Sequence, residues 1–308
     1  MQLVRSILSI LALLLLPYRH VSGWNSAKHA GWTARRSADR TSTIIRRFET
    51  IDPSTANAET TSVGLTIEAC SGDEPSLLKA ATFMIDSFWL GTDTVELTAT
   101  QKSSLISEQF QDLQEKYGER LGKRLLDSRL YVAKDSTEDV WLGMVGVEVT
   151  LLDRTTDGDK LVVLDTATAE SMLKTAVASL GPKQRRQYKD ASLDQIASEI
   201  LVPPFSPENH CYEPICCLSN LAVSPKARRR GVALALCQQV EDFAQQNGYD
   251  LCLKVEEGNI AARKLYETKL GYQLVTTIPD ASALRIDPTA GSFQEITAET
   301  LVLGKSFQ

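Results

Sequence analysis

A stretch of six residues, 228–233, most constrains what this chain can fold into. It follows an apolar run at residues 218–223 and precedes apolar residues at helical spacing, which predicts a strand, a turn and a helix. The first turn of a helix leaves amide N–H groups without internal partners, and the helix dipole favours negative charge there. Gly231 allows a close approach of the backbone. The segment therefore predicts a pyrophosphate site; the alternative is a basic, solvated helix end.

The sequence beyond this glycine continues with helices and strands in alternation. Apolar spacing predicts a helix over residues 232–247, with Gly248 as its stop. Residues 251–256 alternate between apolar and polar side chains, which is typical of a half-buried strand. A shorter helix is expected over residues 260–270, closed by Gly271.

Two runs in this region resemble motifs A and B of the GNAT superfamily, the acetyl-CoA-dependent N-acetyltransferases. The A signature, Gln/Arg-x-x-Gly-x-Gly/Ala, is matched by Arg228, Gly231 and Ala233. The B signature is Asn-x-x-Ala-x-x-Leu-Tyr followed by Gly-Phe/Tyr, and it is matched by Asn259, Ala262, Leu265, Tyr266, Gly271 and Tyr272. The resemblance is close over residues 217–275. Within the superfamily, the chain resembles the plastid-targeted protein N-acetyltransferases of algae and plants.

The resemblance implies an α/β (α+β) fold, in which a mixed, mostly antiparallel central sheet is flanked by helices. Residues 61–308 would form this acetyltransferase domain. The expected elements outside the motifs are a strand at 65–70, helices at 74–89 and 100–127, and strands at 129–134, 140–152 and 298–303.

An insertion at about residues 153–214 separates the strands before motif A. A structureless loop of this length is uncommon in a compact domain, so a helical insertion is expected, with helices at 167–179 and 192–200. The basic run 183–189 between them is read as solvated surface. The alternative is a contact for an acidic acceptor or partner.

The resemblance also assigns residues to acetyl-CoA. The backbone after the strand would hold the pyrophosphate, the strand end would pair with the pantetheine arm, and one of its amides would face the thioester carbonyl. Asn259 would contact the same arm, although an N-cap of the following helix is an equally good role for it. The implied cofactor-binding residues are Leu221, Ala222, Val223, Arg228, Arg229, Arg230, Gly231, Val232, Ala233, Leu234, Asn259 and Ala262.

The candidate catalytic residues are Tyr266, which the resemblance implies, and Glu256, which should share a strand face with Cys252 and Lys254. Tyr266 matches the general acid of the family, which helps the thiolate to leave; its alternative role is that of a core aromatic. Some related N-terminal acetyltransferases carry a glutamate base on the strand after motif A, where this chain has Lys254. Glu256 and Glu148 remain as candidate bases, and each is equally well explained as a surface or ion-paired carboxylate.

The expected reaction is direct attack of a primary amine on the thioester of acetyl-CoA. An α-amino group titrates near about 7.7–8.0 and a lysine near about 10.4, so an enzyme without a strong base favours α-amines. Protein N-terminal α-amines are therefore the expected acceptors, with lysine side chains as a second class. The alternatives are a small amine, such as an arylalkylamine or a polyamine, and a non-catalytic acetyl-CoA-binding regulatory module.

Charge and the N-terminal sequence bound the remaining classes. A net charge of −6 argues against a general nucleic-acid binder. Residues 1–23 are typical of a signal peptide, and the basic segment and linker at 24–60 are transit-peptide-like, which predicts a plastid protein without a membrane span in its mature form. Secretion is the alternative. The six cysteines show no metal-binding spacing, so no metal is expected, and whether any cysteines pair is left open.

Overall fold

The computed structural model describes residues 65–307, apart from 91–95, 120–124, 138–139, 156–160, 189–190, 202–209 and 288. These residues belong to one compact unit, Thr60–Gln308. The signal peptide and transit-peptide-like segment predicted at 1–23 and 24–60 lie outside the described residues.

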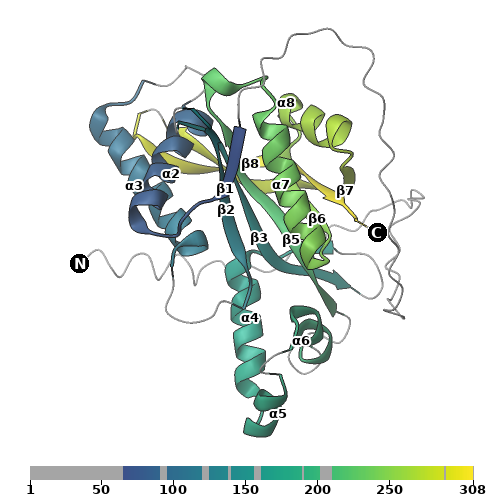
Figure 1. The fold of residues 1–308 in the computed structure, drawn as a ribbon. Helices are drawn as coiled ribbons and strands as arrows, with labels where there is room; N and C mark the ends of the chain where they lie inside the picture. Colours follow the sequence, from purple (N-terminus) through teal and green to yellow (C-terminus); the bar gives the residue numbers. More distant parts are fainter. Residues whose placement is uncertain are drawn as a thin grey trace. The chain divides into compact units, whose positions relative to one another are not determined.

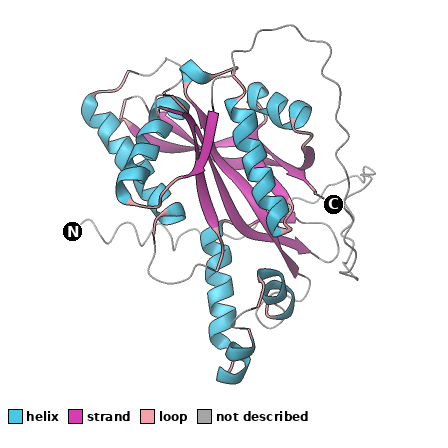
Figure 2. Cartoon of the chain, viewed as in Figure 1, coloured by secondary structure: helices cyan, strands magenta, loops and turns pink. Residues whose placement is uncertain are grey.

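A single eight-stranded sheet forms the centre of this unit (Figures 1 and 2). Its order is β1-β2-β3-β5-β6-β8-β7, with β4 paired to β3 beside this path. Every neighbouring pair is antiparallel except β5 and β6, which confirms the predicted mixed, mostly antiparallel sheet. The strands are β1 (Leu65–Ala69), β2 (Ser128–Asp135), β3 (Trp141–Thr155), β4 (Leu161–Val163), β5 (His210–Val223), β6 (Leu251–Glu256), β7 (Gln273–Asp287) and β8 (Ser292–Lys305).

Helices cover the two faces of the sheet because neighbouring residues of a strand point to opposite sides. On one face Met144 of β3 packs in a cluster with α2 (Glu74–Met84) and α3 (Ala99–Tyr117). On the other face Val145 and Val147 belong to the cluster that contains the buried side of α7 (Val232–Asn247). A π-helical turn, Ile85–Trp89, continues α2. The α2 and α3 face and the α7 face thus hold separate clusters.

Glycines in the left-handed region bound α7 at both ends, as the sequence predicts. Gly231 is its N-cap with φ 83°, and Gly248 is its C-cap with φ 74°. A glycine reaches these angles without the steric cost of a Cβ. The first turn of α7 therefore begins directly after the basic residues 228–230.

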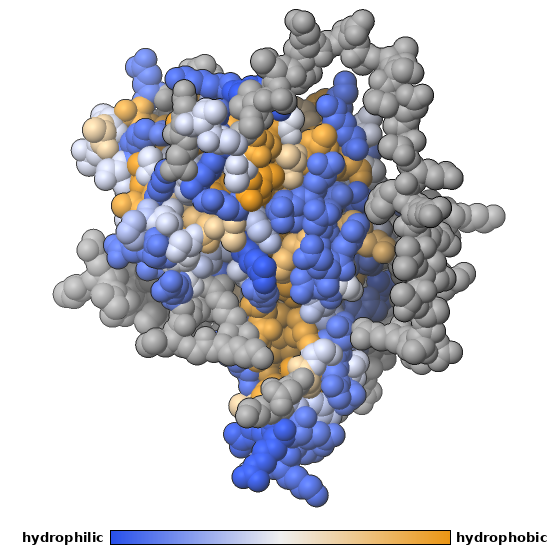
Figure 3. Space-filling model, viewed as in Figure 1, coloured by the Kyte–Doolittle hydropathy of each residue, from blue (hydrophilic) through white to orange (hydrophobic). Residues whose placement is uncertain are grey.

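The insertion between β3 and β5 is helical, as predicted, but its boundaries differ. It contains β4 and three helices, α4 (Thr166–Ser179), α5 (Pro182–Gln187) and α6 (Leu193–Glu199). The three helices lie at the lower end of the sheet in Figure 1. Residues 183–187 of the basic run belong to the short helix α5, where Figure 3 shows a hydrophilic surface. Strands β3 and β5 extend into the range expected for the insertion. A 2.7 Å hydrogen bond joins Asp153 and His210 across these strands, and a 3.4 Å ion pair joins Arg154 and Glu213. These polar residues do not alternate with apolar ones, so the sequence carries no strand signal here.

Three further elements differ from the expectation. Helix α3 ends at Tyr117, and Gly118 is its C-cap, although the apolar spacing continues further. Strand β7, which was not predicted, forms a long hairpin with β8. The helix expected at 260–270 consists of α8 (Ile260–Arg263) and a π-helical turn, Lys264–Lys269. None of the helices among the described residues is long and apolar enough to cross a membrane.

Candidate active site

Strands β5 and β6 separate in the middle of the sheet. They pair over three residues each, Cys216–Leu218 with Leu251–Leu253. Strand β5 then continues to Val223 along β3 alone, so within the described part of the chain no strand pairs with the β6 side of residues 219–223. An edge of this kind can take up an extended ligand as if it were an added strand.

A β-bulge lies where the two strands part. The register between β3 and β5 shifts between Met144 and Gly146, and Asn220 has φ 52°. Asn220 is one of two non-glycine residues with positive φ among the described residues. Its side-chain amide donates a 3.2 Å hydrogen bond to Tyr117 Oη. A bulge re-aims the backbone groups of its strand, which here are those of the predicted pantetheine segment Leu221, Ala222 and Val223.

The turn after β5 presents backbone amides to open space. Arg229 has φ 66° and Gly231 has φ 83°. The first hydrogen bond of α7 runs from Ala235 N–H to Gly231 C=O, so the amides of Val232, Ala233 and Leu234 come before it. No heavy atom outside the adjoining residues lies within 4 Å of a Cβ built on Gly231. This loop therefore fits the pyrophosphate of the predicted cofactor.

The three arginines of the loop have different surroundings. The guanidinium of Arg228 donates to the carbonyl of Val223 at 3.5 Å and to that of Ser87 at 3.0 Å. It thereby fastens the loop to the end of β5 and to the π-helical turn after α2. Arg229 and Arg230 are exposed, so their charges are available beside the amides.

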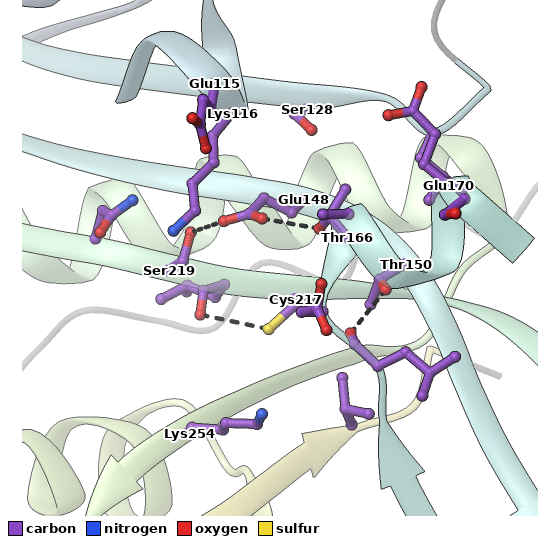
Figure 4. A pocket seen from close by; sticks show the side chains of 18 of the residues that line it. Glu115, Lys116, Ser128, Glu148, Thr150, Thr166, Glu170, Cys217, Ser219 and Lys254 are labelled. Atoms are coloured by element: carbon purple, nitrogen blue, oxygen red, sulfur yellow. Dashed lines mark hydrogen bonds between the residues drawn. The ribbon is translucent and has the colours of Figure 1, made fainter. Parts of the chain in front are cut away.

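A cavity of about 740 Å³ lies beside the point where β5 and β6 part. Strands β3, β5 and β6, the end of α3 and the start of α4 line it, and Figure 4 shows its polar side chains. Glu148 and Thr150 have the same strand parity as Met144, so the cavity lies on the α2 and α3 face, opposite α7. The insertion supplies Asp165, Thr166, Glu170 and Lys174 to its wall.

Glu148 of this cavity accepts hydrogen bonds from three side-chain hydroxyls. Its Oε1 accepts hydrogen bonds from Ser219 Oγ at 2.8 Å and from Tyr117 Oη at 3.2 Å, and its Oε2 accepts one from Thr166 Oγ1 at 2.8 Å. The residue is 8% exposed. Glu148, one of the two candidate bases, is thus fixed in position by three neutral hydroxyls, and Figure 4 shows those of Ser219 and Thr166.

Gly146 allows this network to form. A Cβ at Gly146 would collide with Tyr117 Oη and would come within 2.7 Å of Ser219 Oγ. Burial, with the neighbouring Glu148 charge, raises the pKa of Tyr117 well above its usual value, so its hydroxyl stays protonated and can donate. Sequence analysis missed Tyr117, Ser219 and Thr166. The only local signal was a polar Ser-Asn pair inside an apolar strand.

The other candidate base, Glu256, is held elsewhere. Both of its carboxylate oxygens accept hydrogen bonds from the Arg285 guanidinium, one at 2.8 Å. This hydrogen-bonded pairing lowers the pKa of Glu256, which makes it a weaker proton acceptor. Glu256 does not line the cavity. Glu256 is therefore an ion-paired carboxylate, and its partner Arg285 lies on β7, a strand that was not predicted.

Tyr266 lies in the core of the α7 face. It is 6% exposed, and its ring packs edge-on against Tyr272 with 5.9 Å between the centroids. Burial, with a smaller contribution from Cys237, raises its pKa, so the hydroxyl is protonated at neutral pH. Tyr266 is not among the cavity residues. It belongs to the π-helical turn Lys264–Lys269, and turns of this kind are frequent at functional sites.

Asn259 and Ala262 hold the start of α8 together. The Asn259 side chain accepts a 3.2 Å hydrogen bond from Ala262 N–H, which confirms the N-cap role. This contact leaves the amide nitrogen of Asn259 for a ligand.

Cys217 is the cysteine that reaches the cavity. It lies opposite Cys252 of β6, and their hydrogen bond lowers the pKa of Cys217, helped by Lys254 and Lys116. None of the six cysteines, which all lie among the described residues, forms a disulfide, and no group of His, Cys, Asp or Glu among the described residues could hold a metal ion.

The comparison with protein families finds one match in the half of the chain that holds the loop and the separated strands. Residues 202–272 match the family described as Acetyltransferase (GNAT) family. The match includes the loop, α7, β6 and the segment with Tyr266. It confirms the family and the acyltransferase class predicted from motifs A and B. No curated protein matches the chain.

Similar solved structures include NAA60 of Arabidopsis thaliana in complex with acetyl-CoA. It is 13% identical, with coverage of 78% of this chain and 97% of that one and a TM-score of 0.41. The ribosomal-protein-S18-alanine N-acetyltransferase of Escherichia coli is 14% identical, with coverage of 79% and 96% and a TM-score of 0.39. The similarity to the acetyltransferase family therefore rests on the matched segment 202–272 and not on these two structures. Residues 202–272 of this chain are thus similar to the acetyltransferase (GNAT) family.

Proposed function

We propose that this protein is an N-acetyltransferase that moves the acetyl group of acetyl-CoA to a primary amine, most readily the α-amine of a protein N-terminus. One observation carries the proposal. The separated strands β5 and β6 lie next to a cavity in which Glu148 is fixed, and the open amide loop at Gly231 follows the free end of β5. A donor and an acceptor can therefore meet at one place in the sheet.

Acetyl-CoA would supply the acetyl thioester, and the chain would hold it at two places. The amides of Val232, Ala233 and Leu234 and the charges of Arg229 and Arg230 suit a pyrophosphate. The free edge of residues 221–223 suits the extended pantetheine arm.

Glu148 is the group placed to take the proton of the acceptor amine. Its carboxylate lies in the cavity, and its three hydroxyl partners fix its orientation. An α-amine titrates at about 7.7–8.0 and a lysine at about 10.4, so an α-amine gives up its proton more readily. This difference supports α-amines as the main acceptors and lysine side chains as a second class.

Tyr266 would assist the leaving thiol from the α7 face. Its raised pKa lies above that of a thiol, at about 8.5. A hydrogen bond from the hydroxyl to the thiolate is therefore expected, rather than complete proton transfer.

A small amine is the second candidate acceptor. The cavity of about 740 Å³ has the size of a small-molecule site, and the insertion walls one side of it.

Release of CoA tests the proposal. The protein is incubated with acetyl-CoA and with three acceptor sets: peptides with free N-termini, N-terminally blocked peptides with one lysine, and small amines such as arylalkylamines and polyamines. Faster turnover of the free N-termini supports the proposal. Turnover of small amines alone supports the second candidate, and no turnover with any acceptor supports a regulatory acetyl-CoA-binding module.

The plastid location predicted from residues 1–60 is also a proposal. A fluorescent fusion of the full chain tests it, and a signal in the secretory pathway would contradict it.

A further inference from the structure

The cavity beside the separated strands is lined by charges of both signs. Its carboxylates and ammonium groups belong to Glu115, Glu148, Asp165, Glu170, Lys116, Lys174 and Lys254. A charged ligand binds well in this cavity only where it pairs with a side-chain charge that has no partner of opposite sign in the protein.

Several of these charges already have partners inside the protein. Lys174 pairs with Glu170 at 3.1 Å, and Lys116 pairs with Asp112, also at 3.1 Å. Asp165 accepts hydrogen bonds from the backbone and hydroxyl of Thr168 and so caps α4.

Lys254 is different. Its side chain is exposed, it borders the cavity, and no hydrogen bond or ion pair to any described residue holds its ammonium group. In Figure 4 the side chain reaches toward the cavity from the β6 side. Glu148 enters from the β3 side, and its hydrogen-bond partners are three hydroxyls, with the charge of the ion-paired Lys116 nearby. Lys254 is thus a cation of the cavity that can bind a ligand, and Glu148 is an anion across the cavity from it.

The register of the strands sets the distance between these two groups. Glu148 lies opposite Cys217, and Cys217 lies opposite Cys252, two residues before Lys254. The two backbones are separated by two strand spacings, about 10 Å, and both side chains extend inward from them. Lys254 is also the first residue of β6 beyond the paired segment, so it stands where the strands part.

We infer that the acceptor is an amine with a carboxylate a few bonds away, whose ammonium group binds Glu148 while its carboxylate binds Lys254. This inference rests on the proposed function and narrows its acceptor class. Two sources carry this chemistry: a polypeptide whose first residue is Asp or Glu, and a free amino acid with its own α-carboxylate.

Matched acceptors test the inference with the full chain. Peptides of one sequence begin with Glu or Gln, or with Asp or Asn, and free amino acids are compared with their α-amides. Acetylation is followed by CoA release, and kcat/KM is compared within each pair. We expect the acid to exceed its amide by about 10-fold or more, the usual contribution of a charge-assisted hydrogen bond.

Variants identify the residue responsible. Lys254→Met should bring the acid-to-amide ratio to about one, mainly through a higher KM for the acids, while Lys254→Arg should retain the preference. Lys174→Met, which removes a cavity lysine that is already paired, should keep the wild-type ratio. The peptide pairs and the free amino acids show separately which source is used.

A ratio near one in the wild type, or one that survives Lys254→Met, overturns the inference but leaves acetyl transfer intact. Absence of turnover with every acceptor overturns both the inference and the proposed function.

Discussion

Ser219 Oγ donates a 2.8 Å hydrogen bond to Glu148 Oε1 across the antiparallel strands β3 and β5. Ser219 is the residue just before the bulge at Asn220, and it follows the last residue of β5 that pairs with β6. The candidate base is therefore fixed directly to the place where the strands part. A change at Glu148 should affect the chemistry without disturbing the loop at Gly231.

The first prediction concerns Glu148. Glu148→Gln keeps the shape and the ability to accept hydrogen bonds but removes the basic group. We expect kcat to fall by about 100-fold, the usual range for loss of a general base, with the KM for acetyl-CoA unchanged. Steady-state kinetics with a free-N-terminus peptide measures both values. A kcat within a factor of about two of wild type would remove Glu148 from the proton transfer.

Glu256→Gln is the matched control on the neighbouring part of the sheet. Because Glu256 is bound by Arg285 and lies outside the cavity, we expect kcat to stay close to wild type. A large loss of kcat would return Glu256 to the catalytic group.

Glu256→Gln should also lower the free energy of unfolding by an amount that depends on pH. The pKa of Glu256 is lowered from its ordinary value of 4.5 by Arg285, so the pair stabilises the folded state above the unfolded pKa. This stabilisation disappears as the pH falls through the lowered folded value. The pair is partly exposed, so about 0.2–1 kcal/mol is expected at pH 7. Denaturant unfolding of both proteins from pH 7 to pH 3 measures the difference, and a gap that grows toward low pH would contradict the pairing.

The glycines at the two ends of α7 give a matched pair of variants. Gly231→Ala and Gly248→Ala each place a Cβ at a left-handed residue, at opposite ends of α7. Each should cost about 1 kcal/mol of stability. Only Gly231→Ala puts a methyl group beside the open amides, so it alone should weaken acetyl-CoA binding, by about 10-fold or more, or about 1.4 kcal/mol. Equal affinities for the two variants would place the cofactor elsewhere.

Two tyrosines with touching rings separate chemistry from packing on the α7 face. Tyr266→Phe should lower kcat by about 10-fold or more through loss of a hydrogen-bond donor to the leaving thiolate, with acetyl-CoA binding retained. Tyr272→Phe removes a hydroxyl from the adjacent ring and should leave kcat near wild type. Rapid-quench measurement of the acetylated peptide reports the chemical step. Equal effects of the two variants would make Tyr266 a core aromatic only.

The elements with strong periodicity could be predicted from the sequence. The α7 boundaries at Gly231 and Gly248, strand β6 and the Asn259 cap all follow from local signals that the structure confirms. The signals are local because each depends on residues within one turn or one strand.

The cavity could not be predicted in the same way. Tyr117 of α3, Glu148 of β3 and Thr166 of α4 come from three separate elements, and only the packing of these helices on the sheet brings them together. A glycine is needed at position 146 because Tyr117 Oη, on a helix earlier in the chain, occupies the space of a Cβ. This contact cannot be read from the local sequence. The partner of Glu256 is on β7, a long strand whose exposed edge residues carry no apolar alternation strong enough to identify it.

Calorimetric titration of the full chain with acetyl-CoA tests the central claim most directly. The account predicts saturable binding with one site per chain, weakened about 10-fold or more by Gly231→Ala and unaffected by Gly248→Ala. Folded protein that takes up neither acetyl-CoA nor CoA would contradict it.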